Sequence, residues 1–198
     1  MVGLAARTIE AQFAVAEFMP ARLTVDLFKA ARGVPTTVRT RLVRDGRRVR
    51  NSECELLQDG AVVARATLVQ YRRSAAPAGK EWSATMYLPT PVDVVEGVGN
   101  TPLVNAACAA EGTSLVTNLG TAGIGYINGD LTMALARLPV DDWIYVQADS
   151  HWVAEGVSVG AATLYDRDGP FGTGLVTAVS NPQAQIDFAD DTPVAESI

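Results

Sequence analysis

The second half of the chain repeats the pattern of the first half, and this repeat restricts the fold more than any other feature. The stretch LTVDLF…LLQDGAVVARATLV, residues 23–69, aligns with LTMALA…LYDRDGPFGTGLVTAV, residues 131–179. Leu23 aligns with Leu131 at the start, and Val69 aligns with Val179 at the end. Each copy contains a tight turn, QDG or RDG, between two stretches typical of strands. A chain of 198 residues with this repeat is therefore expected to build one unit twice.

Each unit is predicted to be a helix followed by an antiparallel meander. Residues 1–18 predict the first helix, and TVRTRLV at 37–43 has the alternation of a half-buried strand. The second helix is predicted in TPLVNAACAAEGTSLV, with Thr101 as N-cap and Pro102 in the first helical position. Its Ala-rich, apolar faces predict burial all round. One buried helix wrapped by a curved antiparallel sheet is a hotdog, so the repeat predicts an α+β double hotdog.

The repeat and the composition together give the expected domain organisation. The first hotdog covers residues 1–73 and begins inside its helix, so we expect it to lack an opening strand. Residues 74–100, rich in Pro and Gly, are a predicted linker. The second hotdog covers residues 101–180, and the acidic stretch 181–198 is a predicted disordered tail.

Charge and cysteine content exclude several classes of protein. Residues 1–99 carry 14 Lys and Arg against 10 Asp and Glu, whereas residues 100–198 carry 2 against 12. This asymmetry argues against a nucleic-acid-binding protein, which needs a broad basic face. The sequence has no apolar run of membrane-span length and no signal-peptide pattern, and Cys54 and Cys108 indicate two free thiols. We therefore expect a cytoplasmic protein without a membrane span.

Four stretches resemble the acyl-CoA thioesterase II family of double-hotdog proteins. They are ARLTVDLF, RDGRRVRNSECELLQDGAVVARATLVQYRR, INGDLTMALARLPVDDWIYVQADS and TLYDRDGPFG, and the resemblance spans roughly residues 1–180. It implies hydrolysis of a fatty acyl-CoA thioester to a free acid and CoA, by an activated water and without a metal or organic cofactor. The acyl chain is expected in an apolar slot between helix and sheet. Hotdog proteins commonly associate, which implies a homo-oligomer.

Glu111 is the first candidate catalytic residue. It is the single carboxylate in the apolar second helix, which predicts a buried carboxylate able to activate water as a general base. The family places an acidic residue here, usually Asp. The alternative is a surface Glu beside Gly112. Ser114, one helical turn later, is expected to share its face and to contact substrate. The alternative for Ser114 is packing, with a hydrogen bond back to a carbonyl.

Asn128 is the second catalytic candidate. The family has a hydroxyl residue or Asn at this strand position, which implies that Asn128 orients the nucleophilic water. Its carboxamide can donate and accept at once, as that role requires. Asp130, two residues later, is expected on the same side of the strand and in contact with substrate. The alternative for both is a turn before the strand, because NGD is a strong turn tripeptide.

The third catalytic position departs from the family pattern. The family carries Gln on the last strand, whereas here the position falls on Val176 or Thr177, depending on one gap. Thr177 could supply a hydroxyl hydrogen bond and is the third candidate; Val176 could not. The missing Gln favours an alternative function, a catalytically impaired acyl-CoA or lipid-binding module. A further alternative is a scaffold or heteromeric subunit whose sheet edge pairs with another chain.

The sole histidine and an arginine cluster complete the candidates. His151 in ADSHWVAEG is expected near a strand end, structural or solvated. One His without a Cys cluster excludes a conventional zinc site, and without GxSxG there is no hydrolase elbow for it to serve. The arginines could bind the phosphates of CoA, but an exposed, charge-protected hairpin is the preferred interpretation. They are Arg39, Arg41, Arg44, Arg47, Arg48 and Arg50.

Overall fold

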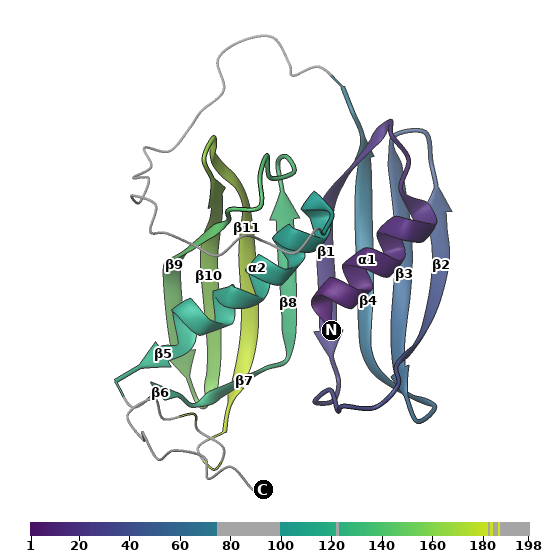
Figure 1. The fold of residues 1–198 in the computed structure, drawn as a ribbon. Helices are drawn as coiled ribbons and strands as arrows, with labels where there is room; N and C mark the ends of the chain where they lie inside the picture. The colour runs from purple at the N-terminus through teal and green to yellow at the C-terminus, as the bar shows by residue number, and fades with distance from the viewer. Residues whose placement is uncertain (75–99, 122, 182, 184–185, 187–198) are drawn as a thin grey trace, which may run out of the picture.

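In this computed structural model the described residues are 1–74, 100–121, 123–181, 183 and 186. The predicted linker 74–100 and tail 181–198 lie almost entirely outside them. The first half of the chain contains α1 (Val2–Phe13), β1 (Phe18–Leu27), β2 (Thr37–Asp45), β3 (Val49–Gln58) and β4 (Ala61–Arg72) (Figure 1). The second contains α2 (Pro102–Asn118), β5 (Leu119–Gly120), β6 (Gly123–Ile124), β7 (Tyr126–Asn128), β8 (Asp130–Leu135), β9 (Tyr145–Ala154), β10 (Val157–Asp166) and β11 (Gly169–Ser180).

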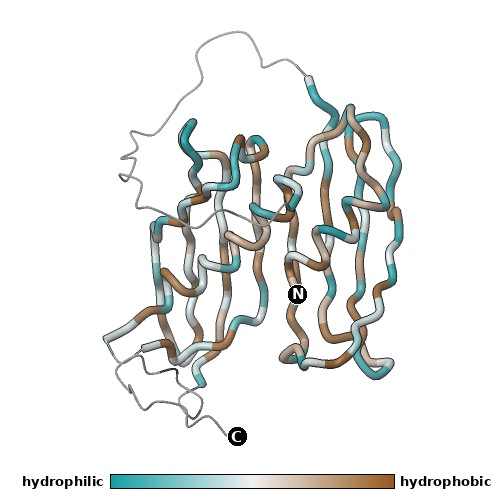
Figure 2. The backbone as a smooth tube through the Cα atoms, in the orientation of Figure 1, coloured by the Kyte–Doolittle hydropathy of each residue, from teal (hydrophilic) through white to brown (hydrophobic). Residues whose placement is uncertain are grey.

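One antiparallel sheet runs through both halves. Its strand order is β2-β3-β4-β1-β8-β11-β10-β9, and β7 pairs with β11 beside this path. Both helices lie on one face of the sheet, α1 over the first half and α2 over the second (Figure 1). Along the strands, hydrophobic and hydrophilic residues alternate (Figure 2), as expected for a sheet with one face on the core. The predicted α+β double hotdog is confirmed.

The sequence repeat is also a repeat of structure. Thr24 of β1 pairs with Thr132 of β8, and their hydroxyl oxygens are 3.2 Å apart. The offset between these two residues, 108, is the same as that between Leu23 and Leu131. The β3–β4 hairpin shifts register between Leu56 and Leu57, and the β10–β11 hairpin repeats this with a shift between Leu164 and Tyr165. The offset of 108 therefore holds at the end of the repeat too, and the alignment of Val69 with Val179 is wrong. The two halves are therefore related by a local two-fold axis at the β1–β8 junction.

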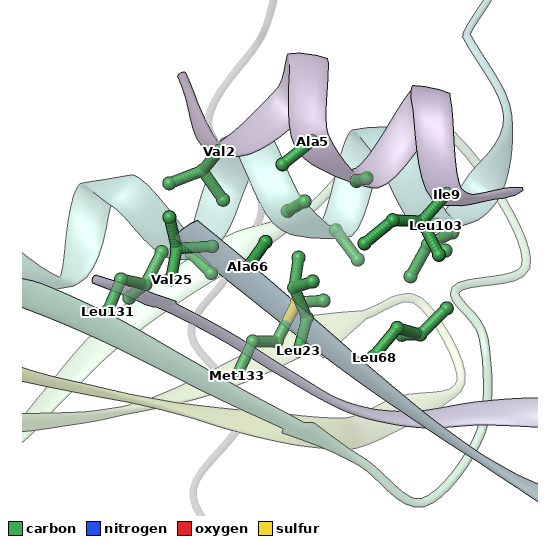
Figure 3. Packing of buried hydrophobic residues seen from close by; sticks show 14 of the residues in the cluster. Val2, Ala5, Ile9, Leu23, Val25, Ala66, Leu68, Leu103, Leu131 and Met133 are labelled. Carbon is green, nitrogen blue, oxygen red and sulfur yellow. The ribbon is translucent and has the colours of Figure 1, made fainter. Parts of the chain in front are cut away.

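The core is continuous across that junction. Figure 3 shows Val2, Ala5 and Ile9 of α1 facing the sheet, where side chains of β1, β4 and β8 meet them. Each of the ten labelled side chains is at most 2% exposed. Burying apolar surface stabilises by about 25 cal/mol per Å², so the two halves stabilise each other through this shared cluster. The labelled residues outside α1 are Leu23, Val25, Ala66, Leu68, Leu103, Leu131 and Met133.

Helix α2 begins as the sequence predicts but is not buried all round. The Val104 N–H donates to Thr101 Oγ1 at 3.3 Å, which satisfies one of the free donors of the first turn. Leu115 is 49% exposed and Val116 37% exposed, so the prediction of complete burial is wrong. The reason is that the sheet and α1 contact only part of the helix surface. None of the helices in the described residues is both long and apolar enough to cross a membrane.

Asp166 fixes the β10–β11 turn from a fully buried position. Arg137 donates to both carboxylate oxygens, at 2.5 and 2.7 Å, and the Val140 and Asp168 N–H groups donate to them at 2.9 Å. Burial opposes the charged form, but the Arg137 and backbone hydrogen bonds outweigh it. They hold the pKa of Asp166 below its ordinary value. Asp166, the first Asp of the LYDRDG stretch, therefore stabilises the fold.

Candidate functional site

A cavity of about 470 Å³ opens near the junction of the two halves. It lies where β1 ends, beside the middle of α2 and the short strand β7. Its walls combine apolar side chains with a few polar ones, the usual composition of a small-molecule site. The lining residues are Met1, Leu27, Phe28, Lys29, Ala30, Ala31, Glu111, Ser114, Tyr126, Ile127 and Asn128.

Three of the five residues predicted from the sequence meet at this cavity. Glu111 and Ser114 are one helical turn apart on α2, and Asn128 ends β7. Asn128 pairs with Ala178 of β11, which is only 4% exposed, so this register position faces the helices. The chain thus brings a carboxylate, a hydroxyl and a carboxamide together from segments that the sequence separates.

A chain of hydrogen bonds leads from the cavity into the protein. Ser114 Oγ donates to Asn128 Oδ1 at 2.5 Å, and Asn118 Nδ2 donates to Ser114 Oγ at 3.2 Å. Ser158 Oγ of β10 in turn donates to Asn118 Oδ1 at 2.7 Å. The sequence analysis missed Asn118 and Ser158. A polar residue four positions after Ser114 was a usable signal for Asn118, whereas nothing local pointed to Ser158.

Glu111 lies at the surface of the cavity, which corrects the prediction of a buried carboxylate. Its side chain is 47% exposed because it points from the side of α2 that the sheet does not cover. Oε1 accepts from the Val2 N–H at 3.3 Å, at the positive end of the α1 dipole. Oε2 has no hydrogen-bond partner among the described residues and is available to a water molecule in the cavity.

Asp130 and Thr177 lie on the other face of the sheet, so the same-side prediction for Asp130 is wrong, and neither residue lines the cavity. Thr177 Oγ1 donates to Asp130 Oδ2 at 2.6 Å, and the Thr177 N–H donates to Oδ1 at 3.0 Å. Gly129 separates β7 from β8 and breaks the alternation on which the same-side prediction depended. The inward position on β11 belongs to Val176, which is fully buried and has no polar group to offer.

The expected acyl slot between α2 and the sheet is filled at two positions. Thr117 lies directly over Gly160 of β10, and Thr113 lies over Gly174 of β11. A Cβ built on either glycine would be 2.1 Å from the threonine Oγ1 above it. The helix therefore rests on the backbone of the sheet here, and the prediction of an apolar slot is wrong at these points.

We expect Gly160→Ala to destabilise the protein by about 1–3 kcal/mol, the usual cost of overpacking a core. Thr117→Ala should restore part of this loss in the double variant, because it removes Oγ1 and Cγ2, at 2.1 and 3.0 Å from the new methyl group, while the Cβ at 2.6 Å stays. Urea unfolding of both single variants and the double variant measures the coupling. Gly33→Ala is the control, since its Cβ would meet nothing within 4 Å. Equal stability of Gly160→Ala and Gly33→Ala would contradict the close approach.

His151 is part of β9 and takes no part in the cavity. The residue is exposed, and its ring centroid is 6.3 Å from that of Tyr126 in an edge-on arrangement. This position agrees with the expected structural or solvated histidine. Within the described ranges, no three His, Cys, Asp or Glu side chains are grouped as metal ligands would be.

The arginine cluster lies on β2, β3 and their connecting turn, which β4 separates from β1 and the cavity. The β2–β3 turn is level with the Phe18 end of β1, and the cavity lies at its Leu27 end. Arg41 pairs with Glu53 on the outer face, as an exposed, charge-protected hairpin would. Arg50 differs, because it is 7% exposed and binds Asp45 and the Phe13 carbonyl. Among the lining residues of the cavity, Lys29 is the one basic side chain.

Comparisons with known proteins agree with this architecture. Residues 55–177 match the family model of the acyl-CoA thioesterase C-terminal domain, and residues 1–71 match that of the N-terminal domain. The first of these matches alone covers more than half of the chain. No curated protein matches the sequence significantly.

Several solved structures share the fold at low sequence identity. The tesB protein of Mycobacterium avium subsp. paratuberculosis is 14% identical with a TM-score of 0.69, over 91% of this chain and 84% of its own. The acyl-CoA thioesterase II TesB2 of Mycobacterium marinum is 12% identical with a TM-score of 0.68, over 89% and 86%. A hot dog fold protein of unknown function from Alicyclobacillus acidocaldarius is 16% identical with a TM-score of 0.61, over 89% and 84%. At these identities the likeness establishes the fold.

Proposed function

The chain belongs to the acyl-CoA thioesterase family, and on this premise we propose that it hydrolyses an acyl-CoA thioester to the free acid and CoA. The observation that carries the proposal is the meeting of Glu111, Ser114 and Asn128 at one cavity. A carboxylate that lines the same cavity as a hydrogen-bonded carboxamide suits the activation and orientation of a water molecule.

The proposed reaction forms no covalent bond between the acyl group and the protein. Water gives a proton to Glu111 Oε2 as its oxygen attacks the thioester carbonyl carbon, while Asn128 Nδ2 holds the water by donating to it. The C–S bond then breaks, and the proton on Glu111 passes to the departing CoA sulfur. This sequence returns Glu111 to its charged form and balances every proton.

The thioester oxygen gains negative charge in the transition state and needs hydrogen-bond donors. The N–H groups of Phe28 and Lys29 are already used, because both donate to the Val63 carbonyl. The N–H groups of Ala30 and Ala31 have no hydrogen-bond partner among the described residues, and both residues line the cavity. We therefore assign these two amides to the oxyanion.

The substrate is expected to carry a short acyl chain. The apolar walls of the cavity suit an acyl group, and Lys29 is available to a phosphate of CoA. The contacts of Thr113 and Thr117 with the sheet glycines leave no space for a long chain beneath the second half of α2. The expected preference is therefore for short over long acyl groups.

A second candidate function is binding of acyl-CoA without hydrolysis. It is favoured by the inward, fully buried Val176 and the outward Thr177. Because of these two placements, β11 supplies no third polar group to work with Glu111 and Asn128 on a water molecule.

Thiol release from a panel of acyl-CoAs, from acetyl to palmitoyl, tests the proposal. Protein without substrate corrects for the exposed Cys108, which reacts with the thiol reagent. Release of CoA, fastest from short chains, is the expected result. No release combined with a raised melting temperature would identify a binding module. No release and no change in melting temperature would overturn both candidates.

A further inference from the structure

Two side chains behind the cavity, Asn118 and Ser158, are connected to Asn128 by hydrogen bonds through Ser114. Neither of them lines the cavity. Ser158 is fully buried and Asn118 is 4% exposed, so solvent water cannot reach these side chains to replace a lost hydrogen bond. Their effect on the site therefore passes entirely through Ser114, which is itself 9% exposed.

The hydrogen bonds fix one direction along the whole chain of residues. Ser158 donates to Asn118 Oδ1, so the Asn118 carboxamide must present Nδ2 to Ser114. Ser114 Oγ accepts that bond, and its single hydroxyl proton goes to Asn128 Oδ1. Asn128 is left with Nδ2 as the group free to donate to a molecule in the cavity.

Turning any one of these groups round would leave buried polar atoms facing like atoms. Reversing all of them together would leave the hydroxyl proton of the fully buried Ser158 without an acceptor among the described residues. An unsatisfied buried donor or acceptor costs about 1–3 kcal/mol, and the low polarity around the chain strengthens this preference. The arrangement therefore keeps the carboxamide of Asn128 in one of its two orientations before any ligand binds.

The first half of the protein does not repeat this arrangement. Asn128 pairs with Ala178, and at the equivalent place in the first half Pro20 pairs with Gln70. Pro20 has no side-chain polar group, and α1 contains neither Ser nor Asn. Ser158 pairs with Ala178, and the residue that pairs with Gln70 on β3 is Arg50. Ser52, also on β3, is as buried as Ser158, and its hydroxyl has no partner among the described residues. A feature required only by the shared fold would be expected in both halves.

We propose that Asn118 and Ser158 are positioning residues, which turn Asn128 so that its Nδ2 donates to the attacking water. This inference rests on the proposed role of Asn128 in thioester hydrolysis. The oxygen of the attacking water accepts a hydrogen bond, so the group that holds it must be a donor. If the Asn128 carboxamide were reversed, it would present Oδ1 to the water instead of Nδ2.

The test compares Ser158→Ala and Asn118→Asp with the matched control Ser52→Ala. In Asn118→Asp the carboxylate accepts from both serines, so the Ser114 proton turns away from Asn128. We expect kcat to fall roughly 10- to 100-fold in both variants, with KM changed less than about twofold. Ser158→Thr keeps the hydroxyl and should retain most of kcat, and Ser52→Ala should match the wild type. Urea unfolding verifies that every variant is folded.

A second readout follows Asn128 itself in the ligand-free protein. The NMR signals of its side-chain amide should shift in Ser158→Ala and Asn118→Asp and stay in place in Ser52→Ala. Unchanged kcat together with unmoved Asn128 signals in the folded variants would overturn the inference. If the wild type hydrolyses no acyl-CoA, the proposed function fails, and the amide signals alone decide whether Asn118 and Ser158 orient Asn128.

Discussion

Replacing Glu111 by Gln is expected to lower kcat for thioester hydrolysis roughly 100- to 10,000-fold, the usual contribution of a general base. Gln has nearly the same size, and its amide oxygen can still accept from the Val2 N–H that Glu111 binds at 3.3 Å. It loses the ability to take a proton from water. It also loses the charge that pairs with the Met1 ammonium at 3.9 Å, a partly exposed ion pair of the kind that contributes less than about 1 kcal/mol. We therefore expect an inactive protein with its α1 contact and its stability preserved.

Thiol release and urea unfolding, measured on the same preparations, separate the two effects. Glu17→Gln is the control, because this exposed Glu is outside the cavity and its side chain has no hydrogen bond among the described residues. It should keep the kcat of the wild type. A Glu111→Gln protein that retains kcat within about twofold would show that another group activates the water.

Asp166→Asn is expected to lower the free energy of unfolding by about 3–5 kcal/mol at pH 7, the usual cost of removing one partner of a buried ion pair. The carboxylate accepts from Arg137 and from two backbone N–H groups. A neutral carboxamide accepts fewer of these bonds and turns a donor toward the remaining ones. The control is Asp26→Asn, since Asp26 is an exposed carboxylate on β1. This surface substitution should change stability by less than about 0.5 kcal/mol.

The ion pair of Asp166 with Arg137 makes the free energy of unfolding depend on pH. Because the pKa of Asp166 is lower in the folded protein than its ordinary value of 3.8, the unfolded chain binds this proton more tightly. The stabilisation is therefore fully present above about pH 4 and is lost as the pH falls through the folded pKa. Urea unfolding at pH 7 and pH 3 should show the wild type losing more stability than Asp166→Asn. An equal loss in the two proteins would contradict a lowered pKa.

The fold could be predicted because the repeat carries it. The strand pattern, the two hairpin turns and the Thr101 cap are local signals, and each of them lies in the structure where the sequence placed it. The offset of the repeat, 108 at its start, recurs in the structure as the separation between Thr24 and Thr132, which pair on the local axis. Local signals such as these can be interpreted without knowledge of tertiary contacts.

The candidate site could be predicted only in part, because its errors depend on tertiary placement. The same-side prediction for Asn128 and Asp130 assumed one uninterrupted strand, and Gly129 interrupts it. The predicted burial of Glu111 assumed a helix covered on all sides, and the sheet covers one side only. Ser158 is 40 residues from Asn118, a distance over which no local pattern connects two polar side chains.

The junction of β1 with β8 joins two copies of one unit within a single covalent chain. An assembly of two identical subunits carries every substitution twice, so a change that suits one site is imposed on the other. Here the two copies change independently, and one has Pro20 where the other has Asn128. Covalent duplication therefore lets one copy serve as rigid support while the other is free to specialise.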